Sequence, residues 1–228
     1  EKLFLWICRG MAWSSVAILG VLLFRLLESG GGWVTWDFLN HFPSRFPARA
    51  GIRSAIFGTL WLIGLTAVFS IPLGIATAVY LEEFSRRESR FSRIVEVNIA
   101  NLAGVPSILY GLLGLAVFVR GLGLGRSLWA GSFTLALLVL PIIVISARAA
   151  IRSVPDSIRH AAFGLGATRW QTVFGQVLPA ALPGILTGVI LALSRAMGES
   201  APLVMIGALS FVAFVPESPS DQFTALPV

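Results

Sequence analysis

Charged residues are scarce in this chain of 228 residues. Asp, Glu, Lys and Arg make up 12% of the sequence, whereas hydrophobic residues make up 56%, and the mean hydropathy is +0.85. A soluble domain carries roughly 25% charged residues to cover its surface. The composition therefore excludes an ordinary soluble domain and predicts that lipid covers much of this protein.

Residues that build metal, redox and catalytic sites are also scarce. The sequence has one cysteine, Cys8, and two histidines, His41 and His160, which lie far apart. A single cysteine forms no disulfide within one chain, and isolated histidines predict no metal site. The sequence also lacks a P-loop, a Ser-His-Asp order and paired catalytic carboxylates. We therefore predict neither an enzyme nor a protein with its own cofactor.

Basic residues outnumber acidic residues by 17 to 11, and the isoelectric point is near 11.0. Such a balance raises the question of nucleic acid. Here, however, the basic residues lie in short segments between long apolar runs, where they set the orientation of a membrane protein. We therefore predict contact with membrane lipid and no nucleic-acid partner.

Long apolar runs are abundant. A hydrocarbon core of about 30 Å is crossed by roughly 20 apolar helical residues, and backbone groups in lipid must be satisfied within the span. The sequence therefore predicts an all-α bundle with about five membrane-spanning helices. They are expected at Leu3–Leu27, Ile56–Tyr80, Ile94–Val119, Leu128–Ala147 and Leu178–Ala196. A further apolar stretch, Pro202–Val215, is too short to span.

The basic segments predict the orientation of these spans. Phe84–Arg93 and Arg148–Arg169 are rich in arginine, and the side of a membrane that carries more Lys and Arg is normally cytoplasmic. We therefore expect the N-terminus and both segments in the cytoplasm, with Arg148 as a cytoplasmic anchor. The loop Glu28–Gly51 is expected outside. This loop separates the first span from the others, so the sequence predicts one domain at residues 1–50, which includes the loop, and a larger one at 51–228.

The segment after the fourth predicted span has a helical pattern. Pro155 suits a first helical turn, and Gly166 suits a C-terminal end. Between them an apolar stripe at helical spacing predicts one face, formed by Ile158, Ala161, Ala162 and Leu165. Thr168 and Gln171 have the spacing of a capping box that restarts a second short helix. This pair would lie on lipid headgroups or dock on a partner protein, and its small residues favour docking.

Two ionisable residues close the fifth predicted span. Arg195 and Glu199 are four residues apart, so they share a helix face. Gly198 and Pro202 are expected to break the helix there. A charged pair inside a span is costly and commonly faces a cavity, and a guanidinium suits the oxygens of an anion. The functional interpretation places Arg195 on a translocation path, and the alternative is a self-neutralising structural pair.

The segment at about 154–179 resembles the EAA loop of ABC-importer permeases of the MetI-like type, on its Ala161-Ala162, Gly166 and Leu178-Pro179 positions. In that family this loop is the coupling helix that contacts a cytoplasmic ATPase. The resemblance therefore assigns ATPase coupling to one set of residues. They are Ile158, His160, Ala161, Ala162, Leu165 and Gly166. The sequence departs from the family at two positions, because His160 replaces its Glu and Gln176 replaces an apolar residue.

A second resemblance is more selective. Leu178–Leu203, with its Arg-Ala-Met-Gly-Glu-Ser-Ala-Pro-Leu signature, is similar to A-type permeases of phosphate importers. The likeness also covers three further motifs, Gly58–Leu60, Gly104–Leu115 and Ser210–Pro219. It implies that Arg195, Glu199 and Ser200 lie on the substrate path. It further implies a sixth span beginning beyond Leu226-Pro227-Val228, where this sequence stops.

The resemblance implies a set of partners. They are a cytoplasmic ATP-binding subunit, a second permease in a heterodimer, and an extracytoplasmic phosphate-binding protein. Two other functions stay open on the sequence alone. One is a permease for another oxyanion such as sulfate, molybdate or tungstate, and the other is a membrane receptor or scaffold that transports nothing.

The predicted orientation can be tested by cysteine-accessibility labelling. Cysteines introduced at Ser89 and Thr168 should react only from the cytoplasm, because both lie in arginine-rich segments. Cysteines at Ser44 and Ser220 should react only from outside. Labelling of Ser89 and Thr168 from opposite faces would contradict the predicted topology.

Overall fold

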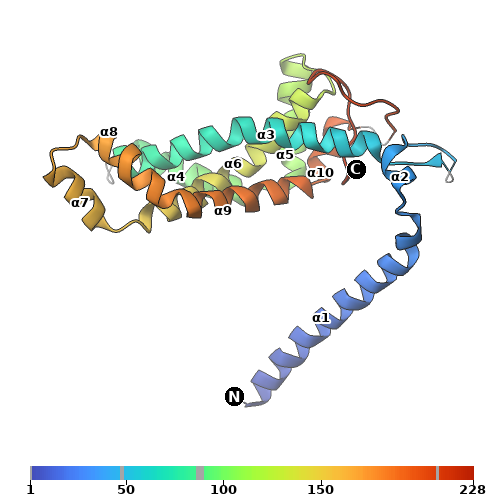
Figure 1. Ribbon diagram of the computed structural model, residues 1–228, viewed down its shortest axis with the longest axis horizontal. Coiled ribbons are helices and arrows are strands. Elements are labelled where there is room, and N and C mark those ends of the chain that lie inside the picture. Colours follow the sequence, from blue (N-terminus) through green and yellow to red (C-terminus); the bar gives the residue numbers. More distant parts are fainter. Residues whose placement is uncertain (1, 47–48, 86–89, 209–210) are drawn as a thin grey trace. The chain divides into compact units, whose positions relative to one another are not determined.

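The computed structural model describes residues 2–46, 49–85, 90–208 and 211–228, and these ranges contain helices and loops but no strand (Figure 1). The expected positions Ser89, Arg86 and Arg87 lie outside the described residues. The chain divides into two compact units, Glu1–Arg53 and Ser54–Val228. The all-helical membrane bundle predicted from the sequence is confirmed.

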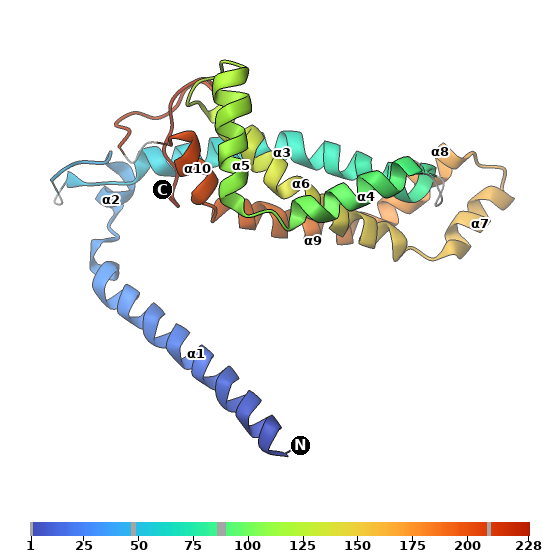
Figure 2. The same ribbon diagram turned by 180° about the vertical axis from the view of Figure 1, so that it is seen from behind.

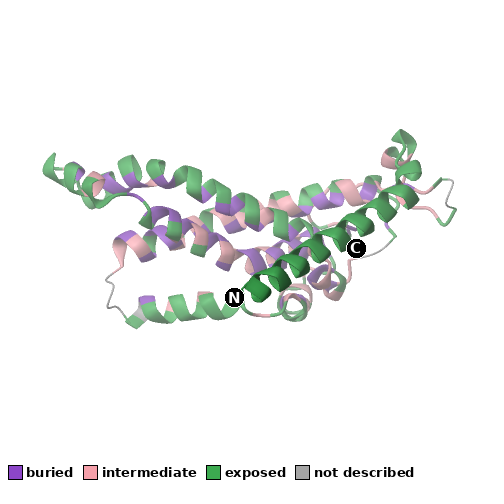
Figure 3. Ribbon diagram, turned by 90° about the horizontal axis from the view of Figure 1, so that it is seen from below, coloured by how far each residue is buried: buried purple, intermediate pink, exposed green. Residues whose placement is uncertain are grey.

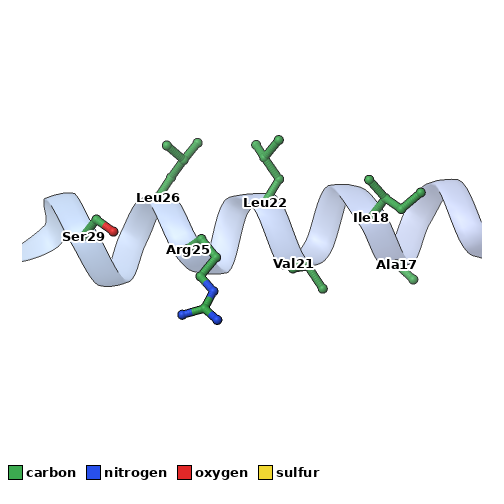
Figure 4. A pocket seen from close by; sticks show the side chains of 7 residues that line it. All are labelled: Ala17, Ile18, Val21, Leu22, Arg25, Leu26 and Ser29. Carbon is green, nitrogen blue, oxygen red and sulfur yellow. The ribbon is translucent and has the colours of Figure 1, made fainter.

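The first unit is dominated by one long apolar helix. Helix α1 covers Lys2–Gly30, and all its classified residues except Gly30 are exposed (Figure 3). Figure 4 shows that Ile18 and Leu22 project from one side of α1, whereas Arg25 projects from the other. Such a helix satisfies its own backbone, so lipid can surround its apolar side chains. The short helices η1 (Gly31–Trp33) and α2 (Trp36–Asn40) follow it.

Three long helices form the frame of the second unit. The first is α3 (Arg53–Val79), which continues through the π-helical turn η3 (Tyr80–Phe84). The second is α6 (Leu128–Arg152). The third runs without interruption over Arg169–Met197 and comprises α8 (Arg169–Thr172), η5 (Val173–Val177) and α9 (Leu178–Met197). These helices run along one another in both views (Figures 1 and 2), and α6 is the most buried of them.

The expected span Ile94–Val119 is not one straight helix. It consists of α4 (Arg90–Ala103), α5 (Ser107–Gly114) and η4 (Leu115–Gly121), and the chain bends by 106° between α4 and α5. Pro106 lacks an N–H and disfavours helical geometry in the residue before it. The Tyr110 hydroxyl donates across the bend to the Leu102 carbonyl oxygen at 2.7 Å. The described chain thus has four spans, or five if the bent pair counts as one.

Glycines allow the helices to approach α6 closely. A Cβ added at Gly188 would lie 2.1 Å from the Ser146 hydroxyl oxygen, and one at Gly184 would lie 2.9 Å from the Ala150 Cβ. Gly74 of α3 lies against Ile143 in the same manner. Spans in lipid gain little from hydrophobic burial against one another, so close packing through small residues holds them together.

The chain after the long helices packs back onto the bundle. Helix α10 covers only Ala201–Ile206, which confirms that the last apolar stretch does not span. In the tail that follows, Phe223 is fully buried. The Thr59 hydroxyl on α3 accepts a hydrogen bond from the Leu226 backbone N–H at 2.9 Å. The tail therefore fastens one end of α3.

Gly58 makes a testable contribution to this packing. Its added Cβ would lie 2.1 Å from the Thr224 carbonyl oxygen, whereas nothing lies within 4 Å of a Cβ at Gly64 on the same helix. We expect Gly58→Ala to lower the free energy of unfolding by about 1–3 kcal/mol through overpacking. Gly64→Ala is the matched control and should leave it unchanged or raise it. Thermal unfolding of both variants in detergent measures the difference, and equal melting temperatures would contradict the tail packing.

Candidate functional site

Helix α7 (Asp156–Gly164) and the glycine turn after it form the segment expected to contact an ATPase. Gly166 adopts φ +81°, a left-handed conformation that favours glycine. Its N–H donates to the Phe163 carbonyl at 2.9 Å, and the Ala167 N–H donates to the Ala162 carbonyl at 3.1 Å. These two bonds form a Schellman motif, which satisfies the last carbonyls of the helix. The expected helix end at Gly166 is therefore found, and it needs that residue.

The second predicted helix of this segment begins at the expected residue, but it is longer than expected. Thr168 accepts from the Gln171 N–H at 3.3 Å, and the Gln171 side chain accepts from the Thr168 N–H at 2.8 Å. This is the expected capping box. The helix it opens is not short, because it continues into the span that ends at Met197. The turn after α7 is thus joined directly to a membrane-spanning helix.

The expected coupling residues do not share one outward face. Ile158 is half-buried and packs against the main core, and Ala162 is buried. His160 and Ala161 are exposed, and Leu165 is 91% exposed. The residues of the expected apolar stripe therefore differ in burial, and Leu165, the C-cap residue whose N–H still donates to the Ala161 carbonyl at 3.1 Å, is the most exposed of them.

Exposed side chains lie in the second half of α7 and at the residue that follows it. We call the exposed residues His160, Ala161, Phe163 and Leu165 the docking face. Figure 1 shows α7 and α8 at one end of the second unit, beyond the parallel helices. An exposed Phe and Leu beside polar residues are typical of a protein-interaction patch.

Arg159 attaches α7 to the bundle. Its Nη2 and Nε donate to Glu83 Oε1 at 2.6 and 3.1 Å, and Glu83 lies in η3 at the end of the α3 helix. The two side chains are 16% and 10% exposed. A charge pair with so little access to water is costly to separate. The position of α7 is thus tied to the end of α3.

Neighbouring ion pairs extend this attachment to two further helices. Glu82 accepts from Arg148 Nε at 2.5 Å and from Arg152 Nε at 2.8 Å. Arg148 also pairs with Glu96 of α4. Arg148, expected from the sequence to be a cytoplasmic anchor, has a largely buried side chain that pairs with two carboxylates.

These pairs surround a polar cavity of about 500 Å³. Its charged lining comes from Glu82, Glu83, Arg152, Asp156, Arg159 and Arg169. Glu82 and Glu83 are functional candidates that the sequence alone did not indicate. Both lie directly after an apolar run. Two adjacent carboxylates at the end of a span indicate nearby cations, because unpaired charges are costly there. Among the described residues, no group of His, Cys, Asp or Glu is arranged to hold a metal.

Arg195 and Glu199 lie at the other end of the same long helix. Arg195 Nε and Glu199 Oε1 are 3.4 Å apart, and the side chains are 57% and 18% exposed. Helix α9 ends at Met197, and α10 begins at Ala201, so the expected break at Gly198 is found. Ser200 is half-buried at that break and makes no side-chain capping bond. Within the described part of the chain, the Nη groups of Arg195 have no hydrogen-bond partner.

The comparisons agree with this architecture. Residues 70–222 match the family model described as "Binding-protein-dependent transport system inner membrane component". The chain belongs to this family, which confirms the resemblance found in the sequence. A solved structure of the MetNI methionine ABC transporter in inward-facing conformations matches with a TM-score of 0.54 and 20% identity. It covers 64% of this chain and 68% of its own, and it supports the fold alone.

Several similar curated proteins are named as permeases of transport systems. The phosphate transport system permease protein PstA 1 of Mycobacterium tuberculosis is 39% identical over 177 residues, which is 77% of this chain. PstA of Haemophilus influenzae is 34% identical, covering 86% of this chain and 70% of the relative. The probable ABC transporter permease protein YqgH of Bacillus subtilis is 35% identical and covers 80% of this chain. The chain spans 57% and 60% of the lengths of the first and third relatives.

Proposed function

We propose that this chain is a permease subunit of an ATP-driven importer of inorganic phosphate. The single observation that carries the proposal is the docking face on α7, which the Arg159–Glu83 pair holds at one end of a membrane bundle. A receptor or scaffold has no need of a rigidly held, partly apolar helix beyond its spans. Phosphate as the substrate rests on the names of the relatives.

The proposed assembly has three partners. A cytoplasmic ATPase binds the docking face and supplies the hydrolysis, so this subunit itself is not an enzyme. A second permease completes the path as a heterodimer, and an extracytoplasmic phosphate-binding protein delivers the anion. The N-terminus and α7 then lie in the cytoplasm, which agrees with Lys2 and Arg9 near the N-terminus and with the arginine-rich segment Arg148–Arg169 that contains α7.

The proposed path includes Arg195, Glu199 and Ser200. Arg195 bonds Glu199 through one long contact from Nε, which leaves the outer edge of the guanidinium available. That edge presents two parallel N–H donors, a geometry that matches phosphate oxygens. Glu199 limits the net positive charge, so that an anion is bound weakly enough to be released.

The docking face is tested by co-purification of the ATPase. Gly166→Pro and a bulky residue at Ala162 should abolish association, but both also disturb the helix end. Leu165→Asp is the sharper variant, since Leu165 is 91% exposed. If Leu165 is an anchor of the interface, its replacement should weaken association by roughly 2 kcal/mol, about 30-fold.

Ser157→Asp is the matched control for this experiment, because Ser157 is an exposed residue in the first turn of the same helix. It should retain the ATPase, since an acidic residue is favourable there. His160→Glu, which restores the family residue, should strengthen association if it changes it. Wild-type recovery of the ATPase by Leu165→Asp would contradict the docking face.

The path is tested by uptake of labelled phosphate. Arg195→Gln should assemble normally but remove nearly all uptake, because a fixed positive charge offsets the desolvation of the anion. Arg195→Lys should keep partial uptake, since it preserves the charge but loses the planar fork. Competition by excess sulfate or molybdate during the same assay would assign the path to another oxyanion.

The double variant Arg195→Gln/Glu199→Gln distinguishes a role of Arg195 in the path from a purely structural role of the pair. A pair that only stabilises the fold should recover both folding and transport when both charges are removed. A path residue should leave a protein that folds but does not transport. Near-normal uptake by the double variant would therefore reject Arg195 as a path residue.

A further inference from the structure

Every N–H donor of the Arg159 guanidinium is used. Besides the two bonds to Glu83, Nη1 donates to the Val154 carbonyl at 2.8 Å and to Asp156 Oδ1 at 3.2 Å. Nη2 also donates to the Ile151 carbonyl at 3.1 Å. A guanidinium with all its donors satisfied is held in one orientation. Arg159 therefore connects α7, the end of α6 and the end of the α3 helix through a single rigid group.

Outside α7 itself, Arg159 donates to a buried carboxylate and to two backbone carbonyls near the end of α6. Ile151 belongs to the last turn of α6, and Val154 follows that helix, so their carbonyls are among those that no helical N–H can reach. Glu83 is 10% exposed, and without Arg159 it would be a buried carboxylate with no cation. The Ile151 carbonyl also accepts from the Val154 N–H at 3.3 Å, so the main cost of moving α7 away from the bundle is the loss of the cation that pairs with Glu83, and such losses are large for charged groups.

Neighbouring ion pairs extend this connection from α3 and α6 to α4. Glu82 holds Arg148 and Arg152 of α6, and Arg148 reaches Glu96 of α4. Since Glu82 and Glu83 are consecutive residues of η3, a displacement of that turn acts on both sets of pairs. Ion pairs thereby join the ends of the α3 and α6 helices to α7 and α4.

We propose that Arg159 is a positioning residue that transmits displacement of α7 to the ends of α3 and α6, with Glu83 as its partner. This inference rests on the proposed function, because it requires an ATPase that moves α7. It assigns separate roles to two neighbouring parts of the segment: the docking face binds the ATPase, and Arg159 converts that binding into movement of the spans. Loss of Arg159 therefore uncouples ATP hydrolysis from transport and leaves docking intact.

The test compares Arg159→Gln, Glu83→Gln and the exchanged pair Glu83→Arg/Arg159→Glu in the assembled transporter. Arg169→Gln is the matched control, since Arg169 lies at the same end of the unit and contacts the Phe84 ring rather than a carboxylate. Two quantities are measured in proteoliposomes: the ATPase activity that co-purifies and the phosphate transported per ATP hydrolysed. We expect both single variants to retain the ATPase but to lose about tenfold in transport per ATP, within the usual range of coupling between sites.

The exchanged pair should recover part of the loss, because it restores the ion pair but not the bonds to the α6 carbonyls. Arg169→Gln should resemble the wild type. Transport per ATP that stays at the wild-type value in Arg159→Gln would overturn the inference. The inference would equally be overturned if Arg159→Gln and Arg169→Gln lowered that ratio alike.

A second measurement needs no partner. Spin labels at Ser157→Cys on α7 and Ala76→Cys on α3, in a chain with Cys8→Ser, report the distance between the two helices. Arg159→Gln should broaden this distance distribution, and the exchanged pair should narrow it again. An unchanged distribution in Arg159→Gln would reject the link. If the wild-type chain captures no ATPase, the proposed function fails, while the spin-label distances still decide whether Arg159 positions α7.

Discussion

Close approach to α6 determines the arrangement of the second unit. Helices α9 and α5 pack against it, and α3 contacts it where Gly74 meets Ile143. At each crossing a small residue replaces a side chain that would otherwise hold the helices apart, as Gly188 does at Ser146 and Gly114 does at Thr134. Because the surroundings of a span are as apolar as its neighbours, such contacts and a few buried polar bonds decide which faces meet. The long helices then carry distant parts of the chain to fixed ends of the bundle.

The two ends of the bundle hold charge in different ways. At the α7 end, Glu82 and Glu83 each bind arginines that lie 66 to 76 residues away in sequence, so the pairs fix tertiary positions. At the Gly198 end, the ion pair that Arg195 makes within the described residues is with Glu199, four positions away. A local pair of this kind costs little to rearrange, whereas the distant pairs cannot change without moving whole helices. The structure thus combines a rigid attachment near the docking face with an adaptable charge near the end of α9.

The sequence was most informative where the structure is local. Apolar run length located the spans, and the Thr168–Gln171 spacing and Gly166 identified a helix start and a helix end, because caps depend on neighbouring residues. The angle of the α4–α5 bend could not be predicted, since Pro106 predicts a break but not its direction. The ion pairs of Arg148 could not be predicted because its partners Glu82 and Glu96 are far away in sequence. The spacing of Gly184 and Gly188 was an overlooked signal, since small residues four apart in a span indicate a packing face.

The segment at residues 158–166 also combines local sequence pattern with contacts to distant parts of the chain. The family pattern at residues 158–166 combines residues that the structure separates: Ala162 and Ile158 pack inward, whereas His160 and Leu165 face outward. An inward alanine allows α7 to lie close to the bundle, and an outward leucine is free for a partner. His160, which stands where the resemblance places a glutamate, is exposed, so under the proposed function it would change the surface offered to the ATPase without changing how α7 is held. Attachment of the segment to its own bundle and the proposed recognition of an ATPase could therefore vary independently, because different side chains of one short helix would perform them.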